Sequence, residues 1–372
     1  MGGMRAPHRG RLASVLLTLA CSEASSTVST DIAPADAVAP DTAAAPEADT
    51  AAPDDSDGAP LPEPYPLDDV LRVNHLQCLG THNSYHVAPG DGIVPDWAYT
   101  HPPLAEQLGR FGVRNFEIDS YPNAETLEFP VVHLPMLDPG TTCASLAECL
   151  GQIAGWSQEN PGHHPLFIML ELKSTQGAEV WVDALDAVVL EALGPERVIT
   201  PDEIRGTAST LREAVTTAGW PSLRATRGRA FVIVMQDEAF YAAWSAGHPG
   251  GAGRAVFVHV PTEHPDAAFV KLDDPTDDRG QIEAAVDAGF IVRTRADTIT
   301  AEPGPDGLYE SVQALEGGAQ MLSTDFLSAR AGGTYRLTLP GGVPSRCNPR
   351  IAPPECTAEA IESPDWLRPV SR

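Results

Sequence analysis

The chain has 372 residues, of which 24 are basic and 51 acidic, so its formal net charge at neutral pH is −27. That length allows one large α/β domain with additional segments, or two domains of ordinary size. The charge argues against nucleic acid as a partner, because a chain this acidic cannot neutralise a row of phosphates. Only two of the basic residues are lysines, Lys173 and Lys271.

The first 21 residues predict export. Basic residues precede a short apolar run, LASVLLTLA, that ends beside Cys21. This run is too short to span a bilayer and is typical of the apolar part of a signal peptide. Ala20 followed by Cys21 resembles a bacterial lipoprotein cleavage site, although Thr18 stands where leucine is usual. We therefore expect a protein that is either secreted or anchored at the bacterial cell surface by a lipid on Cys21.

Residues 22–69 predict a disordered tether. They contain twelve acidic residues, no lysine or arginine, and repeated Ala-Pro steps. Such a segment has little apolar surface to bury and repels itself, so it does not support a packed core. We expect the folded catalytic domain to span residues 70–372, and no transmembrane helix in the mature protein.

Four of the remaining cysteines form two pairs that are close in sequence. Cys143 and Cys149 are one pair, Cys347 and Cys356 are the other, and both lie in turn-rich stretches. Export permits disulfides at these positions. Cys78 lies within an apolar run and is expected to be a buried, inert thiol.

From residue 70 onward, short apolar runs alternate with amphipathic stretches. The expected strands are 75–80, 113–119, 129–134, 165–172, 229–237, 255–260, 290–296 and 319–324. Several are nearly continuous apolar runs, which favours a parallel sheet covered on both faces. Between them lie helical patterns such as 178–193. This order predicts an α/β fold, a (β/α)8 TIM-type barrel, with an open doubly wound sheet as the alternative.

Polar residues interrupt these strands at their carboxyl ends, which form the catalytic rim of such a barrel. They are His82 and Asn83 after the first strand, Glu117 and Asp119 on the second, His133 near the end of the third, and Glu171 and Lys173 at the end of the fourth. Side chains two residues apart on a strand face the same side. Four consecutive strands are therefore expected to deliver these groups to one mouth.

Three converging carboxylates would raise one another's pKa unless a cation balanced them. One lysine is not enough. Amide and carboxylate oxygens suit Ca²⁺, whereas zinc prefers histidine and cysteine, and the histidine spacing here does not fit a compact zinc motif. Two histidines beside such a metal are suited to general acid and base catalysis.

The ordered segments THNSYH, RNFEID, VVHLP and LFIMLELKS resemble the calcium-dependent phosphatidylinositol-specific phospholipase C family, in particular its secreted bacterial branch. VRTRAD, AQMLSTDF and RCNPRIAPPEC are similar to the same branch. The resemblance covers roughly residues 70 to 362. It implies the barrel of the phospholipase C-like phosphodiesterases and a phospholipid or other phosphodiester substrate at a membrane surface. We expect a monomer.

The resemblance also implies roles for individual residues. His82 would bind and polarise the phosphoryl group, and His133 would protonate the glycerol leaving oxygen. Asn83, Glu117, Asp119 and Glu171 would hold the calcium, and one of the carboxylates is a candidate for the base. The family's reaction is attack of the inositol 2-hydroxyl on phosphorus, which releases diacylglycerol and a cyclic inositol phosphate.

Several alternatives stay open at this point. Lys173 and Arg293 either contact substrate or form ion pairs, Lys173 with a ligand carboxylate and Arg293 inside the barrel. Asp325 is interpreted as a helix cap. No basic cluster for additional headgroup phosphates is apparent, which favours simple phosphatidylinositol or an unrelated phosphodiester. Rival functions are a glycerophosphodiester phosphodiesterase or sphingomyelinase D-like enzyme, and a non-catalytic calcium-binding surface lipoprotein.

Overall fold

The computed structural model describes residues 65–90, 94, 97–235, 238–297, 305–329 and 333–367. All of these residues belong to one compact unit, 61–372. The expected signal peptide, Cys21 and the linker up to residue 64 lie outside the described residues. No described helix is long and apolar enough to cross a membrane.

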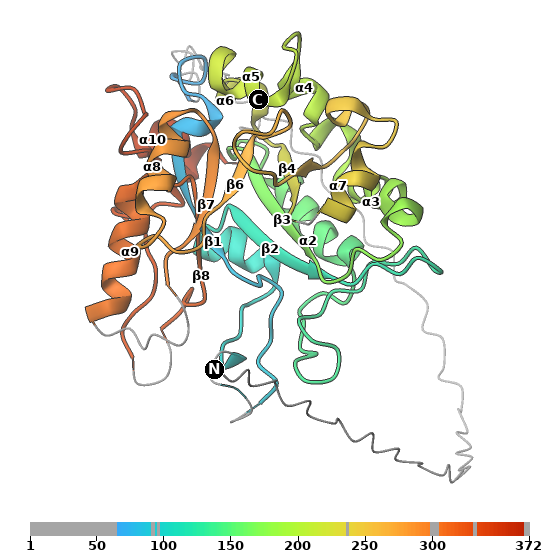
Figure 1. Ribbon diagram of the computed structural model, residues 1–372. Helices are drawn as coiled ribbons and strands as arrows, with labels where there is room; N and C mark the ends of the chain where they lie inside the picture. Colours follow the sequence, from blue (N-terminus) through green and yellow to red (C-terminus); the bar gives the residue numbers. More distant parts are fainter. Residues whose placement is uncertain are drawn as a thin grey trace, which may run out of the picture. The chain divides into compact units, whose positions relative to one another are not determined.

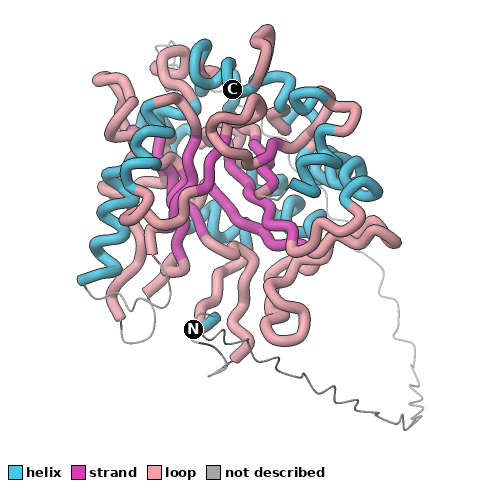
Figure 2. Tube along the Cα trace, in the orientation of Figure 1, coloured by secondary structure: helices cyan, strands magenta, loops and turns pink. Residues whose placement is uncertain are grey.

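Eight parallel strands form the centre of this unit (Figures 1 and 2). They are β1 (Leu76–Thr81), β2 (Asn115–Ser120), β3 (Leu166–Leu172), β4 (Ala230–Val234), β5 (Phe257–Val258), β6 (Phe269–Lys271), β7 (Ile291–Arg295) and β8 (Met321–Thr324). The spatial order is β5-β4-β3-β2-β1-β8-β7-β6. A single parallel bridge, His259 to Phe269, joins the ends of this order. The predicted barrel is confirmed, and the open sheet is wrong because β5 and β6 meet.

One expected strand is wrong and one strand was missed. Residues 129–134 form no barrel strand. Val131 pairs only through an isolated bridge to Ser120, and Pro130, which lacks a backbone N–H, bridges only Ser145. The missing barrel strand is β6, whose three residues are too few to show a pattern. The expected number of barrel strands, eight, is therefore right, although one expected strand is absent and β6 was not predicted.

Helices surround the strands on the outside of the barrel (Figure 2). They are α1 (Leu104–Glu106), α2 (Leu146–Glu159), α3 (Ala178–Leu193), α4 (Pro201–Arg205), α5 (Leu211–Glu213), α6 (Leu223–Thr226), α7 (Glu238–Ser245), α8 (Arg279–Asp287), α9 (Pro305–Gly317) and α10 (Ala358–Ile361). Helix α3 has the bounds that the sequence pattern predicts, and its Trp181 and Leu185 are fully buried. Ser145 caps α2 by accepting a hydrogen bond from the Glu148 amide.

An aromatic cluster fills part of the barrel interior below the level of the catalytic rim. Phe167, Phe231, Phe257 and Phe269 are fully buried, and the ring centroids of the contacting pairs lie 5.1 to 6.5 Å apart. Along β3, Phe167, Met169 and Glu171 share one face because strand side chains alternate. The aromatic cluster therefore fills this level of the barrel together with buried Asn115 of β2, and Glu171, further along β3, faces the mouth.

Both ends of the described region pack onto the barrel. Tyr65 is buried beneath the Arg227 guanidinium, 3.4 Å from its ring centre, and Asp68 forms an ion pair with the same arginine. The folded region therefore begins at least five residues before the expected boundary at residue 70. At the other end, β9 (Ser345–Cys347) pairs antiparallel with β1.

The expected disulfides are present in the structure. Cys143 is bonded to Cys149, and Cys347 is bonded to Cys356. Cys78 is a free, fully buried thiol whose pKa burial raises to about 12, so it is inert. The first disulfide joins the end of the loop that follows β2, which carries His133, to the first part of α2.

Candidate active site

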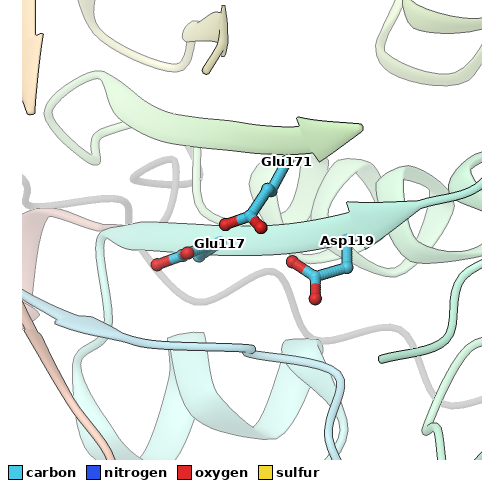
Figure 3. A group of neighbouring side chains, drawn as sticks. All are labelled: Glu117, Asp119 and Glu171. Atoms are coloured by element: carbon cyan, nitrogen blue, oxygen red, sulfur yellow. The ribbon is translucent and has the colours of Figure 1, made fainter. Parts of the chain in front are cut away.

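Three carboxylates meet at the mouth of the barrel. Glu117 and Asp119 lie two residues apart on β2, and Glu171 lies on β3 in register with Asp119. One oxygen of each side chain lies within 4.8 Å of the others, and Figure 3 shows the three groups around a common space. Glu117 and Asp119 are buried, whereas the side chain of Glu171 is partly exposed. The expected convergence of these three residues is observed.

Two cations are paired with this cluster. Lys173 Nζ lies 2.8 Å from Asp119 Oδ2 and 2.6 Å from Glu171 Oε1. The Arg293 guanidinium contacts Glu117 and is itself fully buried. Both basic residues thus take the ion-pair alternative that the sequence left open.

A second layer of charge lies behind Arg293. Its other guanidinium nitrogen contacts Asp273, and Lys271 Nζ lies 3.3 Å from the same aspartate. Lys271 also lies 3.9 Å from Glu171. With both ends of its guanidinium held by buried or half-buried carboxylates, Arg293 is fixed in place and has no exposed surface for a substrate.

Asp119 is the least satisfied member of the cluster. Burial raises its pKa to about 7, although Lys173 opposes this shift. Its Oδ1 is buried without a hydrogen-bond partner among the described residues. A hard divalent cation would satisfy such oxygens, so the donor set fits Ca²⁺.

Asn83 lies beside this cluster in a turn that is tied to β2. The Ser84 amide donates to the Glu117 carbonyl at 2.8 Å, and Ser84 Oγ accepts from the Glu117 amide at 2.9 Å. Asn83 has a left-handed backbone with φ of 42°, and its Nδ2 donates to the Tyr99 hydroxyl at 3.1 Å. The Asn83 carbonyl oxygen is therefore the atom of this side chain that can serve a cation.

His82 is held by a carboxylate that follows β8. Its Nδ1 lies 2.7 Å from Asp325 Oδ1, and Arg295 lies 2.6 Å from Asp325 Oδ2. Burial alone would raise the pKa of Asp325, but His82 and Arg295 lower it to about 2. Asp297 accepts from the Asp325 amide at 2.9 Å and fixes this carboxylate from behind. Asp325 is thus a partner of His82, and its interpretation as a helix cap was wrong.

His133 has the same kind of support from its own loop. Its Nδ1 lies 2.7 Å from Asp138 Oδ2, and buried His86 places Nε2 2.8 Å from the same oxygen. Burial lowers the pKa of His133, while the Asp138 carboxylate opposes the shift. No described residue hydrogen-bonds to Nε2 of His82 or His133, and both rings are about one-fifth exposed. His133 follows β2 in a loop and does not end a barrel strand, which corrects the expected position.

The two supported histidines belong to one aromatic group. The His86 ring centre lies 6.1 Å from that of His133 and 4.3 Å from that of Tyr99. The Tyr99 hydroxyl lies 3.5 Å from His82 Nδ1. His86 and Tyr99 therefore connect the rings of His82 and His133 across the mouth.

The sequence of the chain matches a known protein family, and this match agrees with the fold and the site. The family described as Phosphoinositide phospholipase C, Ca2+-dependent matches residues 71–130 and 120–349. The chain belongs to this family. Its members are phosphatidylinositol-specific phospholipase C enzymes that depend on calcium, and the acidic cluster of the chain fits that dependence.

Solved structures of two bacterial enzymes share the fold of this family member. A Ca²⁺-dependent phosphatidylinositol-specific phospholipase C from Streptomyces antibioticus is 18% identical, with a TM-score of 0.54 over 69% of this chain and 95% of that chain. A calcium-dependent phosphoinositol-specific phospholipase C from a Pseudomonas species, in a myoinositol complex, is 16% identical. Its TM-score is 0.54, over 77% of this chain and 99% of that chain. Among curated protein sequences, none matches this chain.

Proposed function

We propose that this phospholipase C cleaves phosphatidylinositol by intramolecular attack, with His82 and His133 on either side of a calcium site. One observation carries the proposal: two histidines, each held through Nδ1 by a buried carboxylate, lie at the same mouth as three converging carboxylates. A phosphodiester bound at this mouth would meet both free Nε2 atoms.

The proposed reaction has two proton transfers, one to a carboxylate of the cluster and one from His133. The inositol 2-hydroxyl oxygen attacks phosphorus, and its proton passes to a carboxylate of the cluster. The bond from phosphorus to the glycerol oxygen breaks, and that oxygen takes the Nε2 proton of His133. Diacylglycerol and a 1,2-cyclic inositol phosphate leave. His82 donates its Nε2 hydrogen to a phosphoryl oxygen throughout.

The carboxylates behind the histidines orient both rings for these steps. Asp138 holds Nδ1 of His133 and Asp325 holds Nδ1 of His82, so Nε2 of each ring is the atom left for substrate. Asn83, Glu117, Asp119 and Glu171 would hold the calcium. When bound, calcium would lower the pKa of the attacking hydroxyl and offset negative charge on the phosphoryl oxygens.

The substrate we favour is phosphatidylinositol without additional phosphates. Arg293 and Arg295 at the mouth are each paired with a buried carboxylate, and Lys173 supplies one charge at most, which is too little for both a 4- and a 5-phosphate. The rival glycerophosphodiester phosphodiesterases usually begin with His-Arg and have an HD step at the second histidine. This chain has His82-Asn83 and His133-Leu134 at these places.

Removing calcium is expected to stop turnover, because the pKa of the attacking hydroxyl would then not be lowered and the negative charge on the phosphoryl oxygens would not be offset. The test measures release of labelled headgroup from phosphatidylinositol with calcium and with a chelator, and repeats it with glycerophosphocholine. Activity that a chelator leaves unchanged would contradict the metal site. Preferential cleavage of glycerophosphocholine would favour the rival class. A 2-deoxyinositol substrate that reacts at the normal rate would exclude attack by the 2-hydroxyl.

The loop after His133 is expected to contact the lipid surface. Met136 and Leu137 are 93% and 60% exposed at its tip, three and four residues beyond the proposed general acid. Burying such a side chain in lipid contributes about 1.5–3 kcal/mol. Met136→Ser with Leu137→Ser should therefore lower the rate on phosphatidylinositol vesicles by about tenfold or more and spare a monomeric short-chain substrate. Val70→Ser, an exposed position before β1 and so at the other end of the barrel, is the matched control. Equal losses on both substrates would contradict this role.

We also propose that the protein is exported. Two disulfides suit an oxidising compartment. The intact mass of the exported protein distinguishes a lipid on Cys21 from plain secretion.

A further inference from the structure

The two lysines of the chain lie at the same place. Lys173 pairs with Asp119 and Glu171, and Lys271 lies between Glu171 and Asp273. Every other basic residue of the 24 is an arginine. A composition this biased makes lysine at both positions a feature of the site that requires a physical reason.

We propose that Lys173 is a built-in competitor for the calcium site: its ammonium holds oxygens of Asp119 and Glu171 in the metal-free protein and is released from them toward the substrate when calcium binds. The proposal rests on the proposed function, because it assumes that the three carboxylates hold calcium. Under this proposal, the Lys173 side chain couples calcium binding to substrate binding.

The contacts show which oxygens are shared. Lys173 Nζ is 2.8 Å from Asp119 Oδ2 and 2.6 Å from Glu171 Oε1. Both carboxylates belong to the group whose oxygens lie within 4.8 Å of one another. Ca²⁺ takes six to eight oxygen ligands, and the ammonium occupies one oxygen on each of two of the three carboxylates. The ammonium and the metal therefore compete for the carboxylates of Asp119 and Glu171.

The charges at the site lead to the same conclusion. Four carboxylates, those of Glu117, Asp119, Glu171 and Asp273, face Lys173, Lys271 and Arg293. The metal-free cluster is thus close to balance. A divalent ion would leave one excess positive charge if every basic group kept its place, which favours withdrawal of one of them.

Lys173 is the basic group whose withdrawal would free oxygens of the cluster. Lys271 is also a partly exposed lysine, but its Nζ lies closer to Asp273, at 3.3 Å, than to Glu171, at 3.9 Å. Arg293 is fully buried with its guanidinium fixed between two carboxylates, whereas the Lys173 side chain is 19% exposed at the mouth. A lysine ammonium is a point charge on a flexible four-carbon stem, and an arginine fork is more rigid. Once released, the ammonium lies at the rim, where the phosphate of an anionic substrate would bind. This explains why lysine occurs here in a chain that otherwise uses arginine.

The test is calcium binding by titration calorimetry with the full chain, calcium alone as the ligand, and no substrate. Lys173→Met removes the competing charge and keeps a similar stem, so it should tighten calcium binding by about tenfold or more. Arg110→Met is the control: it removes the same charge from an exposed helix position paired with Glu106 and should leave the dissociation constant unchanged. Lys173→Arg restores the charge and should bind calcium no more tightly than wild type.

A second readout is thermal unfolding without and with calcium. Metal-free Lys173→Met should be less stable than wild type and gain more from calcium, because its carboxylates then lack a counter-charge. Lys173→Gln serves in the same comparison if the methionine variant does not fold. Calcium binding to Lys173→Met that is equal to or weaker than wild type would overturn this inference alone. A wild-type chain that binds no calcium would overturn the proposed function as well.

Discussion

Alanine in place of His133 is expected to lower kcat by about 10²–10⁴-fold, the usual contribution of a general acid. The rate falls because His133, whose Nδ1 is held by Asp138, supplies the proton for the leaving oxygen. The described residues of the loop after β2 include no other histidine that could replace it. Steady-state rates on phosphatidylinositol with saturating calcium measure the effect. Calcium binding should stay close to wild type, because His133 contacts none of the three carboxylates among the contacts described.

The control for this prediction is His264→Ala. His264 is a partly exposed histidine near Asp266 in the loop between β5 and β6, and removing it should leave kcat unchanged. His82→Ala should also lose activity, because it removes the donor to the phosphoryl oxygen. Full activity of His133→Ala would mean that the leaving oxygen is protonated from elsewhere, even if phosphatidylinositol is the substrate.

Glutamine at position 362 is expected to destabilise the protein by about 3–5 kcal/mol, the usual cost of breaking a buried ion pair by removing one partner. Glu362 accepts from Arg114 Nε at 2.9 and 3.1 Å and from the His164 amide at 3.1 Å. Arg114 precedes β2 and is 1% exposed, so its charge would be left buried without its carboxylate. Urea unfolding at neutral pH measures the change, with exposed Glu359→Gln as the control.

The ion pair between Arg114 and Glu362 also makes the stability of the folded protein depend on pH. Burial opposes ionisation of Glu362, but Arg114 and His164 lower its pKa to about 2. Because the folded pKa lies below the unfolded value near 4.5, the stabilisation is complete above that value and is lost as pH falls toward 2. The stability difference between wild type and Glu362→Gln should shrink across this window. A constant difference from pH 6 down to 2 would contradict the assignment.

The barrel could be predicted because its longer strands are continuous apolar runs, and β3 is the clearest of them. Its short members could not be located in this way. Strand β6 has three residues, and β5 has two, so neither carries a period. The run 129–134 has strand composition, but the prolines at 130 and 135 remove backbone donors, and the segment ends as a loop beside β2.

The carboxylate cluster could be predicted for a similar reason. Glu117, Asp119 and Glu171 follow from strand alternation and from the rule that parallel strands end together. The carboxylates behind the histidines could not. Asp138 comes from a loop with no pattern, and Asp325 lies 243 residues from its partner His82, so only the fold brings them together.

The closure between β5 and β6 has a consequence for where the barrel opens locally. One bridge joins these strands, whereas β2 and β3, which carry the carboxylates, pair along six residues. Amide hydrogens at the β5–β6 seam should exchange first, while those of β2 and β3 exchange last. New chain ends placed in the loop 260–268 by circular permutation should accordingly be tolerated, with the catalytic half of the barrel intact.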